Sequence, residues 1–325
     1  MNMIECKSFD LSDWPKGQIS RGWVHIVNDG IGRPIKLPIL VARGVQDGPT
    51  LGLSAAVHGN ELNGIPVIQK LFNKLDPSEL CGNIVGILVM NVPGVLQGTR
   101  AFNDKVDLNR IAPGNPKGNM SEVYIYRLLE RIIYHFDYLI DLHTASTGRR
   151  NSYYIRADMS DEVTSRMAKL QGPELILNNP PQGASVRGCA AEKGIKSITI
   201  ELRDPNLFQY SVIDDAVAGI QNVCYDLGLM PGDPICTVEH VTLCDNSSWC
   251  YTNEGGILEV QPHILDEVKE GERIATVRSI FGHITKEFYA PSDGIVIGKS
   301  VSPINQTGSR ILHLGLNPRL ISCTI

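Results

Sequence analysis

The amino-acid sequence predicts an α/β protein, a mixed sheet flanked by helices, followed by a smaller all-β domain. Apolar strand-like runs alternate with amphipathic helical segments in the first part, as in a sheet covered on both faces. The pattern changes at residues 230–234 (Met-Pro-Gly-Asp-Pro), after which long helical periodicity disappears. A chain of 325 residues corresponds to about two domains at roughly 150 residues each. We therefore expect an α/β domain with N-terminal strands over residues 1–232 and a β-rich domain over residues 233–325.

Four compact apolar runs, each bounded by Gly, Pro or polar residues, are predicted to be buried strands. They cover residues 50–57, 84–91, 138–143 and 197–202. Apolar residues at helical spacing predict three helices between and after these strands. The helices are expected around residues 66–75, with Pro66 in the first turn, over residues 121–136, capped by Ser121, and over residues 214–227.

The C-terminal part contains short strand-like runs separated by Gly and Pro turns, which predicts an all-β domain. The runs cover residues 274–277, 283–288, 294–297 and 311–314. Together with Gly255-Gly256 and the Ala-Pro-Ser-Asp-Gly turn at residues 290–294, they look like a lipoyl/biotinyl-type β-sandwich. The Met-Lys-Met-type hairpin that would carry a cofactor is absent. We therefore expect a structural or pocket-shaping module.

Composition excludes several classes of function. The sequence has 30 Lys and Arg against 35 Asp and Glu, a net charge of −5, and no basic stripe that would indicate nucleic-acid binding. No apolar run reaches the roughly 18 residues of a membrane span, and residues 1–16 lack the apolar core of a signal peptide. The eight cysteines form no Cys-x-x-Cys pair, so we expect reduced thiols in a cytoplasmic protein.

Two predicted strands end in residues that can bind a metal ion. His58 and Glu61 follow the first strand in the segment Val-His-Gly-Asn-Glu, and a spacing of three places both side chains on one side of a helical turn. The third strand ends in Asp141-Leu142-His143, and ligands collect beyond the carboxyl ends of strands in open α/β sheets. Two His and one Glu leave a fourth position open for water, as in a catalytic zinc site. Surface or backbone-bonded roles remain the alternative for each residue taken alone.

Other polar residues lie beside these strand ends. Asp141 is on the same side of its strand as His143 and could orient the imidazole. Glu201 ends the fourth strand and could serve as a general base, or it could pair with Arg203 or another cation. Arg100 and Arg110 lie in the segment after the second strand, where they could bind anions or pair with nearby aspartates. A weaker alternative zinc site groups the cysteines at positions 236, 244 and 250 with His240.

The ordered combination is more specific than any of its parts. It resembles the succinylglutamate desuccinylase/aspartoacylase family of the zinc carboxypeptidase superfamily, over about residues 45–230. The residues that carry the resemblance are His58-Gly-Asn-Glu61, Arg100 with Asp107-Leu-Asn109-Arg110, Asp141-Leu-His143, and Glu201. The resemblance implies a zinc-carboxypeptidase-like mixed sheet and one Zn²⁺ per chain, held by His58, Glu61 and His143.

The resemblance also implies a role for four further residues. Glu201 would be the general base that activates water and passes its proton to the leaving amine. Arg100 would polarise the scissile carbonyl and stabilise the oxyanion. Asn109 and Arg110 would hold the free α-carboxylate of a small N-acyl amino acid, the substrate whose amide bond is cleaved.

Several alternatives stay open at this point. A metallocarboxypeptidase acting on peptide C-termini and a non-catalytic metal-binding or ligand-binding protein are the other functions considered. Mn²⁺, Co²⁺ and Fe²⁺ accept the same ligands as Zn²⁺. The acyl group, the amino acid and the oligomeric state, with a homo-oligomer as one alternative, are not determined. Arg149 or Arg150 could bind a second carboxylate, or both could lie in a solvated loop.

Overall fold

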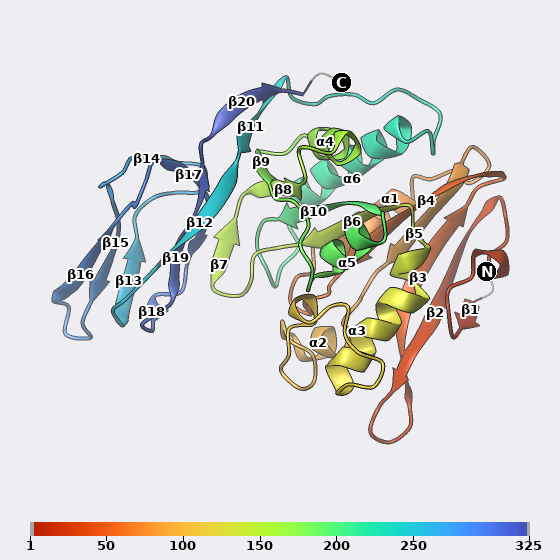
Figure 1. Cartoon of the computed structure of the whole chain (residues 1–325), viewed down its shortest axis with the longest axis horizontal. Coiled ribbons are helices and arrows are strands. Elements are labelled where there is room, and N and C mark those ends of the chain that lie inside the picture. The colour runs from red at the N-terminus through yellow and green to blue at the C-terminus, as the bar shows by residue number, and fades with distance from the viewer. Residues whose placement is uncertain (1–2, 324–325) are drawn as a thin grey trace.

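The computed structural model describes residues 3–323 and contains one large mixed sheet with helices on both faces (Figure 1). The sheet has eleven strands in the order β1-β2-β3-β5-β4-β6-β10-β8-β9-β11-β20. In chain order these are β1 (Met3–Cys6), β2 (Gln18–Asn28), β3 (Pro34–Arg43), β4 (Gln46–Ala55), β5 (Cys81–Ile87), β6 (Tyr138–His143), β8 (Tyr153–Ala157), β9 (Leu175–Asn178), β10 (Lys196–Leu202), β11 (His240–Cys244) and β20 (Arg319–Ser322). The predicted α/β class is confirmed. The two expected domains begin at residue 1 and end at residue 325, and both of these residues lie outside the described range.

The four predicted strands are β4, β5, β6 and β10, and they lie side by side in the centre of the sheet. Here β4 runs parallel to β5 and β6, and β6 runs parallel to β10. Antiparallel neighbours, β3 beside β5 and β8 beside β10, flank this parallel centre. Because the carboxyl ends of β4, β6 and β10 meet at one edge, the polar residues that follow them are brought together.

Helices cover the two faces of the sheet in two groups. They are α1 (Gly64–Phe72), α2 (Val92–Gln97), α3 (Met120–Arg131), α4 (Glu162–Lys169), α5 (Val186–Glu192) and α6 (Tyr210–Asp226). Ile140 and Leu142 of β6 pack in one core with α1, α4 and α6, and Leu139 packs in another with α3 and α5. This alternation along the strand is what buries both faces.

The helix expected over residues 121–136 was wrong at both ends. Its cap is Asn119, whose Oδ1 accepts from the Glu122 backbone N–H at 3.0 Å, while Glu122 accepts from the Asn119 N–H at 2.8 Å. Ser121 instead donates its hydroxyl to Asp104 at 2.7 Å. The reciprocal Asn–Glu pair satisfies two free backbone donors, so the helix begins one residue earlier. It ends at Arg131 and is followed by the separate 3₁₀ turn Ile133–His135.

The C-terminal part is a sandwich of two antiparallel sheets, as expected. One sheet has the order β12-β19-β17-β14, with β7 paired to β17, and the other has the order β16-β15-β13-β18. The strands are β7 (Arg149–Asn151), β12 (Asn246–Tyr251), β13 (Gly256–Val260), β14 (Glu267–Val268), β15 (Arg273–Arg278), β16 (Ile284–Tyr289), β17 (Gly294–Ser300), β18 (Ile304–Asn305) and β19 (Arg310–Leu316). Both sheets share one apolar core, which includes Val277 and Leu312.

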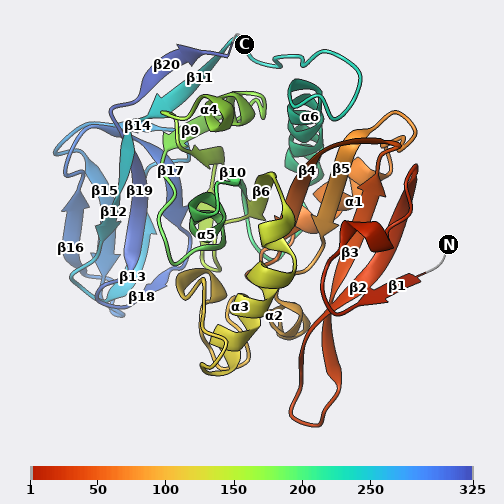
Figure 2. The ribbon, with the colours of Figure 1, turned by 45° about the vertical axis from the view of Figure 1, so that its right-hand side comes forward.

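The sandwich is joined to the large sheet at several points (Figure 2). β7 lies in the sequence of the expected first domain but pairs with β17, and β11 and β20 extend the large sheet beyond β9. A small shared core also contains Tyr154 from β8, Leu177 from β9 and Ile297 from β17. The C-terminal strands therefore hold the loop that follows β6.

Candidate active site

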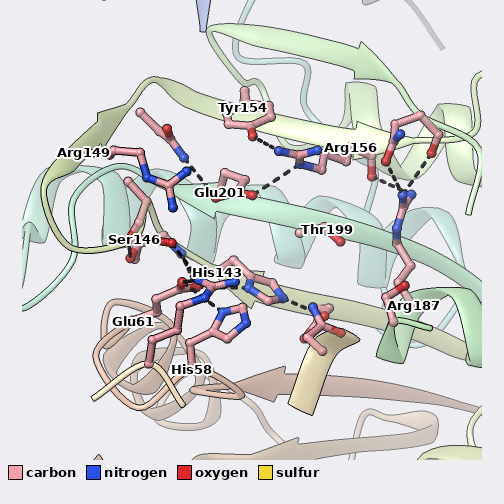
Figure 3. Close-up of a pocket in the computed structure, with 18 of the residues that line it drawn as sticks. His58, Glu61, His143, Ser146, Arg149, Tyr154, Arg156, Arg187, Thr199 and Glu201 are labelled. Atoms are coloured by element: carbon pink, nitrogen blue, oxygen red, sulfur yellow. Dashed lines mark hydrogen bonds and ion pairs between the residues drawn. The ribbon is translucent and has the colours of Figure 1, made fainter. Parts of the chain in front are cut away.

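A pocket of about 220 Å³ lies at the carboxyl ends of β4, β6 and β10 (Figure 3). The structure brings together in its lining all seven residues predicted from the sequence. These are His58, Glu61, Arg100, Asn109, Arg110, His143 and Glu201. Six further arginine or aromatic side chains line the pocket. They come from β7, β8, α5 and the C-terminal strands: Arg149, Tyr154, Arg156, Arg187, Trp249 and Arg310.

The turn after β4 places His58 and Glu61 side by side. Ala56 adopts φ +54°, and the Glu61 backbone N–H donates to the His58 carbonyl at 3.1 Å, which closes the turn. A Cβ at Gly59 would lie 2.0 Å from the backbone of Gly94, so this position has no room for a larger residue. The His58 Nδ1 atom lies 2.9 Å from Oε1 of Glu61 as a result.

His143, at the end of β6, completes the cluster. Its Nδ1 lies 3.0 Å from Oε2 of Glu61, so both imidazoles direct Nδ1 at one carboxylate. The Nε2 atoms face other acids: His143 lies 2.8 Å from Asp141 and His58 lies 3.1 Å from Asp107. The side chains of His58, Glu61 and His143 are 3%, 1% and 7% exposed. Asp141 therefore orients His143, as strand alternation predicted.

This donor set fits a divalent cation. Atoms of His58, Glu61 and His143 lie within 4.8 Å of one another, and no other such cluster of His, Cys, Asp or Glu occurs within residues 3–323. The buried Nδ1 of His58 lacks a well-aligned hydrogen-bond partner among the described residues, despite its closeness to Glu61. A second carboxylate behind each imidazole is the usual support of a metal-binding histidine. The cysteines at positions 236, 244 and 250 form no such site in the described chain.

The charges around the cluster also favour binding of a divalent cation. Burial opposes ionisation of Glu61, but His58 and His143 outweigh it and hold the pKa of Glu61 well below its usual range. Burial likewise opposes ionisation of Asp107, but His58 and Arg100 outweigh it and lower the pKa of this carboxyl group. A metal ion binds the neutral form of an imidazole. With both imidazoles neutral, the three carboxylates of Glu61, Asp107 and Asp141 exceed the one guanidinium by two charges, which a dication would balance.

Arg100 reaches this cluster from the segment after α2. Its Nη1 donates to Oε1 of Glu61 at 2.6 Å and to Oγ of Ser146 at 2.7 Å. Its Nη2 lies 2.9 Å from Oδ2 of Asp107, so the alternative pairing with an aspartate occurs inside the site rather than on a remote surface. The guanidinium is thereby fixed at the edge of the cluster, 31% exposed toward the pocket.

Glu201, at the end of β10, is held at both carboxylate oxygens. Asn151 donates from Nδ2 to Oε2 at 3.2 Å, and Arg156 donates from Nε to Oε1 at 3.3 Å. Tyr154 contacts the same Arg156 guanidinium. The expected alternative partner Arg203 pairs instead with Glu174, at 2.6 Å. Glu201 is thus buried, ionically paired and directed into the pocket.

Asn109 and Arg110 lie in the 3₁₀ turn Leu108–Arg110, which is capped by Asp107. Oδ1 of Asn109 accepts from the Val186 backbone N–H at 2.7 Å, and this bond ties the turn to the start of α5. Arg110 is an exposed side chain on the pocket lining. Both residues therefore line the pocket, Asn109 half-buried and Arg110 exposed.

Several pocket residues were missed from the sequence. Arg156 interrupts the buried run Tyr153–Ala157, and a charge within an apolar strand is a signal that could have identified it. Arg187 is also buried, which lowers its pKa to about 10, and it donates to the Asn179 carbonyl at 3.0 Å. Trp249 and Arg310 come from the C-terminal sandwich, where no motif indicated a part in the site.

Residues 47–226 match the model of the succinylglutamate desuccinylase/aspartoacylase catalytic domain, which is more than half of the chain. The chain belongs to this family. An N-alpha-acetyl-L-2,4-diaminobutyric acid deacetylase from Halomonas elongata is 25% identical over 82% of the chain and 81% of the relative. A succinylglutamate desuccinylase from Pseudomonas paraeruginosa is 28% identical over 48% of the chain, which spans about half (51%) of that protein.

Solved structures show the same family fold. A succinylglutamate desuccinylase/aspartoacylase from Rhodobacter sphaeroides has a TM-score of 0.83 at 22% identity and covers 93% of this chain and 95% of its own. The product-bound ectoine utilization protein EutE (DoeB) from Ruegeria pomeroyi has the same TM-score at 19% identity, over 93% and 96%. No helix within residues 3–323 is long and apolar enough to cross a membrane.

Proposed function

We propose that this family member is a metal-dependent hydrolase that cleaves the amide bond of small N-acyl amino acids. The observation that carries the proposal is the presence of Glu201 and Arg100 in one pocket with the cluster His58, Glu61 and His143. Binding a metal requires neither a directed carboxylate nor a neighbouring guanidinium, whereas hydrolysis of an amide uses both.

His58, Glu61 and His143 would hold one Zn²⁺ per chain. When bound, such an ion polarises a carbonyl and makes water nucleophilic near neutral pH. Asp141 and Asp107 would fix the imidazoles through their Nε2 atoms, at 2.8 and 3.1 Å.

Glu201 would accept a proton from the attacking water at a carboxylate oxygen. As the C–N bond breaks, it would deliver that proton to the leaving nitrogen, so that a carboxylic acid and a free amine are formed. Asn151 and Arg156 restrict its orientation during both transfers. This dual use of one carboxylate is consistent with its burial beside the cluster.

Arg100 would stabilise the negative charge that develops on the carbonyl oxygen. It lies against Glu61 and therefore at the edge of the position that a scissile carbonyl would occupy. Asn109 and Arg110 would hold the free α-carboxylate at the rim, where a guanidinium can bind it bidentately. We propose a small molecule as the substrate and the cytoplasm as the location of the enzyme. The residues that carry out the reaction all belong to the expected first domain, residues 1–232.

The experiment compares N-acyl amino acids, dipeptides and longer peptides as substrates for the metal-loaded protein, with metal analysis and a Glu201→Ala control. We expect release of free amino acid from N-acyl amino acids, and no release by the variant. Faster cleavage of peptides would favour a metallocarboxypeptidase instead. Retained metal with no hydrolysis of any substrate would favour a binding protein.

A further inference from the structure

The strand that carries the proposed general base is followed by a residue in a strained backbone conformation. Arg203 comes directly after β10, two positions beyond Glu201, and adopts φ +58°. This left-handed region suits glycine and costs free energy in a residue with a Cβ, because the Cβ lies too close to the backbone. An arginine held there shows that surrounding contacts fix the chain against its own preference, and such positions cluster at functional sites.

One of these contacts is an ion pair of the Arg203 side chain. Its Nη2 donates to Oε1 of Glu174 at 2.6 Å. The other oxygen of Glu174 accepts from the Tyr153 backbone N–H at 2.7 Å, and the Glu174 N–H donates to the Tyr153 carbonyl at 3.0 Å. Tyr153 lies opposite Leu202, the last residue of β10, in the β8–β10 pairing. The Glu174 carboxylate is therefore anchored on β8 and holds Arg203 beside the strand that it follows.

The carbonyl of Arg203 makes the second contact. It accepts from the Ala145 N–H at 2.8 Å, just beyond the point where β6 and β10 stop pairing. The last pair in that register is His143 with Glu201, so this hydrogen bond closes the end of the sheet at which a proposed metal ligand and the proposed general base lie opposite each other (Figure 3). A change in the dihedral angles of Arg203 would redirect its carbonyl and open this end.

The residue after Ala145 extends the connection to the proposed oxyanion donor. Oγ of Ser146 accepts from Nη1 of Arg100 at 2.7 Å. The same nitrogen donates to Oε1 of Glu61 at 2.6 Å, so the guanidinium has one support on the loop after β6 and one in the metal-binding cluster. The loop support depends on where Ala145 is held.

We infer that Arg203 and Glu174 are positioning residues for the proposed reaction: their ion pair holds the left-handed turn that places the general base and Arg100. The inference rests on the proposed function and adds two residues to it. Within residues 3–323, the pocket lining includes neither Arg203 nor Glu174, so both act through the residues that they hold. Glycine adopts the same backbone conformation without support, which separates the role of the ion pair from other effects of these side chains.

Steady-state kinetics of metal-loaded variants on the best N-acyl amino acid test this role. Glu174→Gln has one amide oxygen, which cannot accept from both Arg203 and the Tyr153 N–H. Arg203→Ala loses the ion pair and keeps a Cβ. Each should lower kcat by about 3–10-fold, with KM within about twofold of wild type and unchanged metal content, because fewer molecules hold the competent geometry. Arg203→Gly loses the same ion pair but does not need it, so kcat should recover to within about twofold of wild type.

The double variant and a remote ion pair make the test specific. In the Arg203→Gly background, Glu174→Gln should cause no further loss of kcat. The matched control is Arg166→Ala: Arg166 is 34% exposed, against 36% for Arg203, and its pair with Asp226 at 3.1 Å joins α4 to α6. This control should keep the wild-type kcat. An equal loss from Glu174→Gln in both backgrounds, or no loss in either, would overturn the inference while leaving the deacylase function intact.

Hydrogen–deuterium exchange tests the same connection without a substrate. The amide of Ala145, which donates to the Arg203 carbonyl, should exchange about threefold faster or more in Glu174→Gln than in wild type. Exchange should stay at the wild-type rate in Arg203→Gly and in the double variant. Unchanged exchange in Glu174→Gln would reject the inference. If the wild-type protein hydrolyses no N-acyl amino acid, the proposed function fails, and the exchange result alone decides whether the ion pair holds this loop.

Discussion

Asn151 donates a 3.2 Å hydrogen bond to Oε2 of Glu201 from a strand that belongs to the C-terminal sandwich. Asn151 lies opposite Gly298 in the β7–β17 pairing, where a Cβ on Gly298 would come within 2.4 Å of Oδ1 of Asn151. The sandwich thus supplies one of the two partners of the proposed general base, and Arg156 on β8 of the large sheet supplies the other. This contact explains how two parts of the chain form one site.

Replacing Asn151 with Ala should lower kcat by roughly 10-fold with little change in KM, because a hydrogen bond to a charged group is worth about 1.5–3 kcal/mol. Steady-state kinetics on an N-acyl amino acid measure the effects on kcat and KM separately. Arg150→Ala, on the same strand but exposed, is the matched control and should retain wild-type kcat. An unchanged kcat in Asn151→Ala would show that Arg156 alone orients Glu201.

Arg100→Ala should lower turnover by roughly 10²–10³-fold, the usual effect of removing one oxyanion donor. The metal content should stay at the wild-type level, because His58, Glu61 and His143 all remain. Kinetics and metal analysis are performed on the same preparation. Retained activity at full metal occupancy would contradict the role of Arg100, and loss of metal would reassign it to holding Glu61.

Arg110→Ala should mainly raise KM, by about 10–100-fold, because its proposed contact with the α-carboxylate is made in substrate and transition state alike. An N-acyl amino acid amide, which lacks that carboxylate, serves as the comparison and should be affected much less by the substitution. If KM for the free acid is unchanged, Arg110 does not bind this group.

His313 should make the fold less stable in acid. Burial and three nearby arginines depress its folded-state pKa below the unfolded value of about 6.5, so the unfolded chain binds the extra proton and stability is lost as the pH falls below 6.5. The loss is at most about 1.4 kcal/mol for each pH unit below 6.5. In urea unfolding, the difference in free energy of unfolding between pH 7.0 and 5.0 should be smaller for His313→Gln than for wild type. The same difference in both proteins would contradict a neutral His313.

The central strands and the residues at their carboxyl ends could be predicted from the sequence, because each depends on a short run of neighbouring residues. β6 coincides with the predicted run 138–143. His143 ends this strand, His58 and Glu61 lie in the turn that follows β4, and the carboxyl ends of the two parallel strands meet. The register of these strands is determined by their apolar residues, because a shift of one residue would turn the buried side chains to the opposite face.

The rest of the site depends on contacts between distant parts of the chain. Trp249 and Arg310 belong to the C-terminal sandwich, which the β7–β17 pairing joins to the loop after β6. A pairing between residues some 150 positions apart leaves no periodic signal in either segment. The end of α3 was also missed, since Ile132 and Ile133 continue the apolar pattern while the backbone has already left the helix.

The most direct test of the central claim is the turnover of the metal-loaded Glu201→Gln variant on the best N-acyl amino acid. Gln keeps the size of Glu201 and can still contact Asn151 and Arg156, but it cannot accept the proton of the attacking water. We predict at least a roughly 100-fold fall in kcat, with unchanged metal content and a KM close to wild type. A variant that binds the metal and hydrolyses the amide at the wild-type rate would contradict the account.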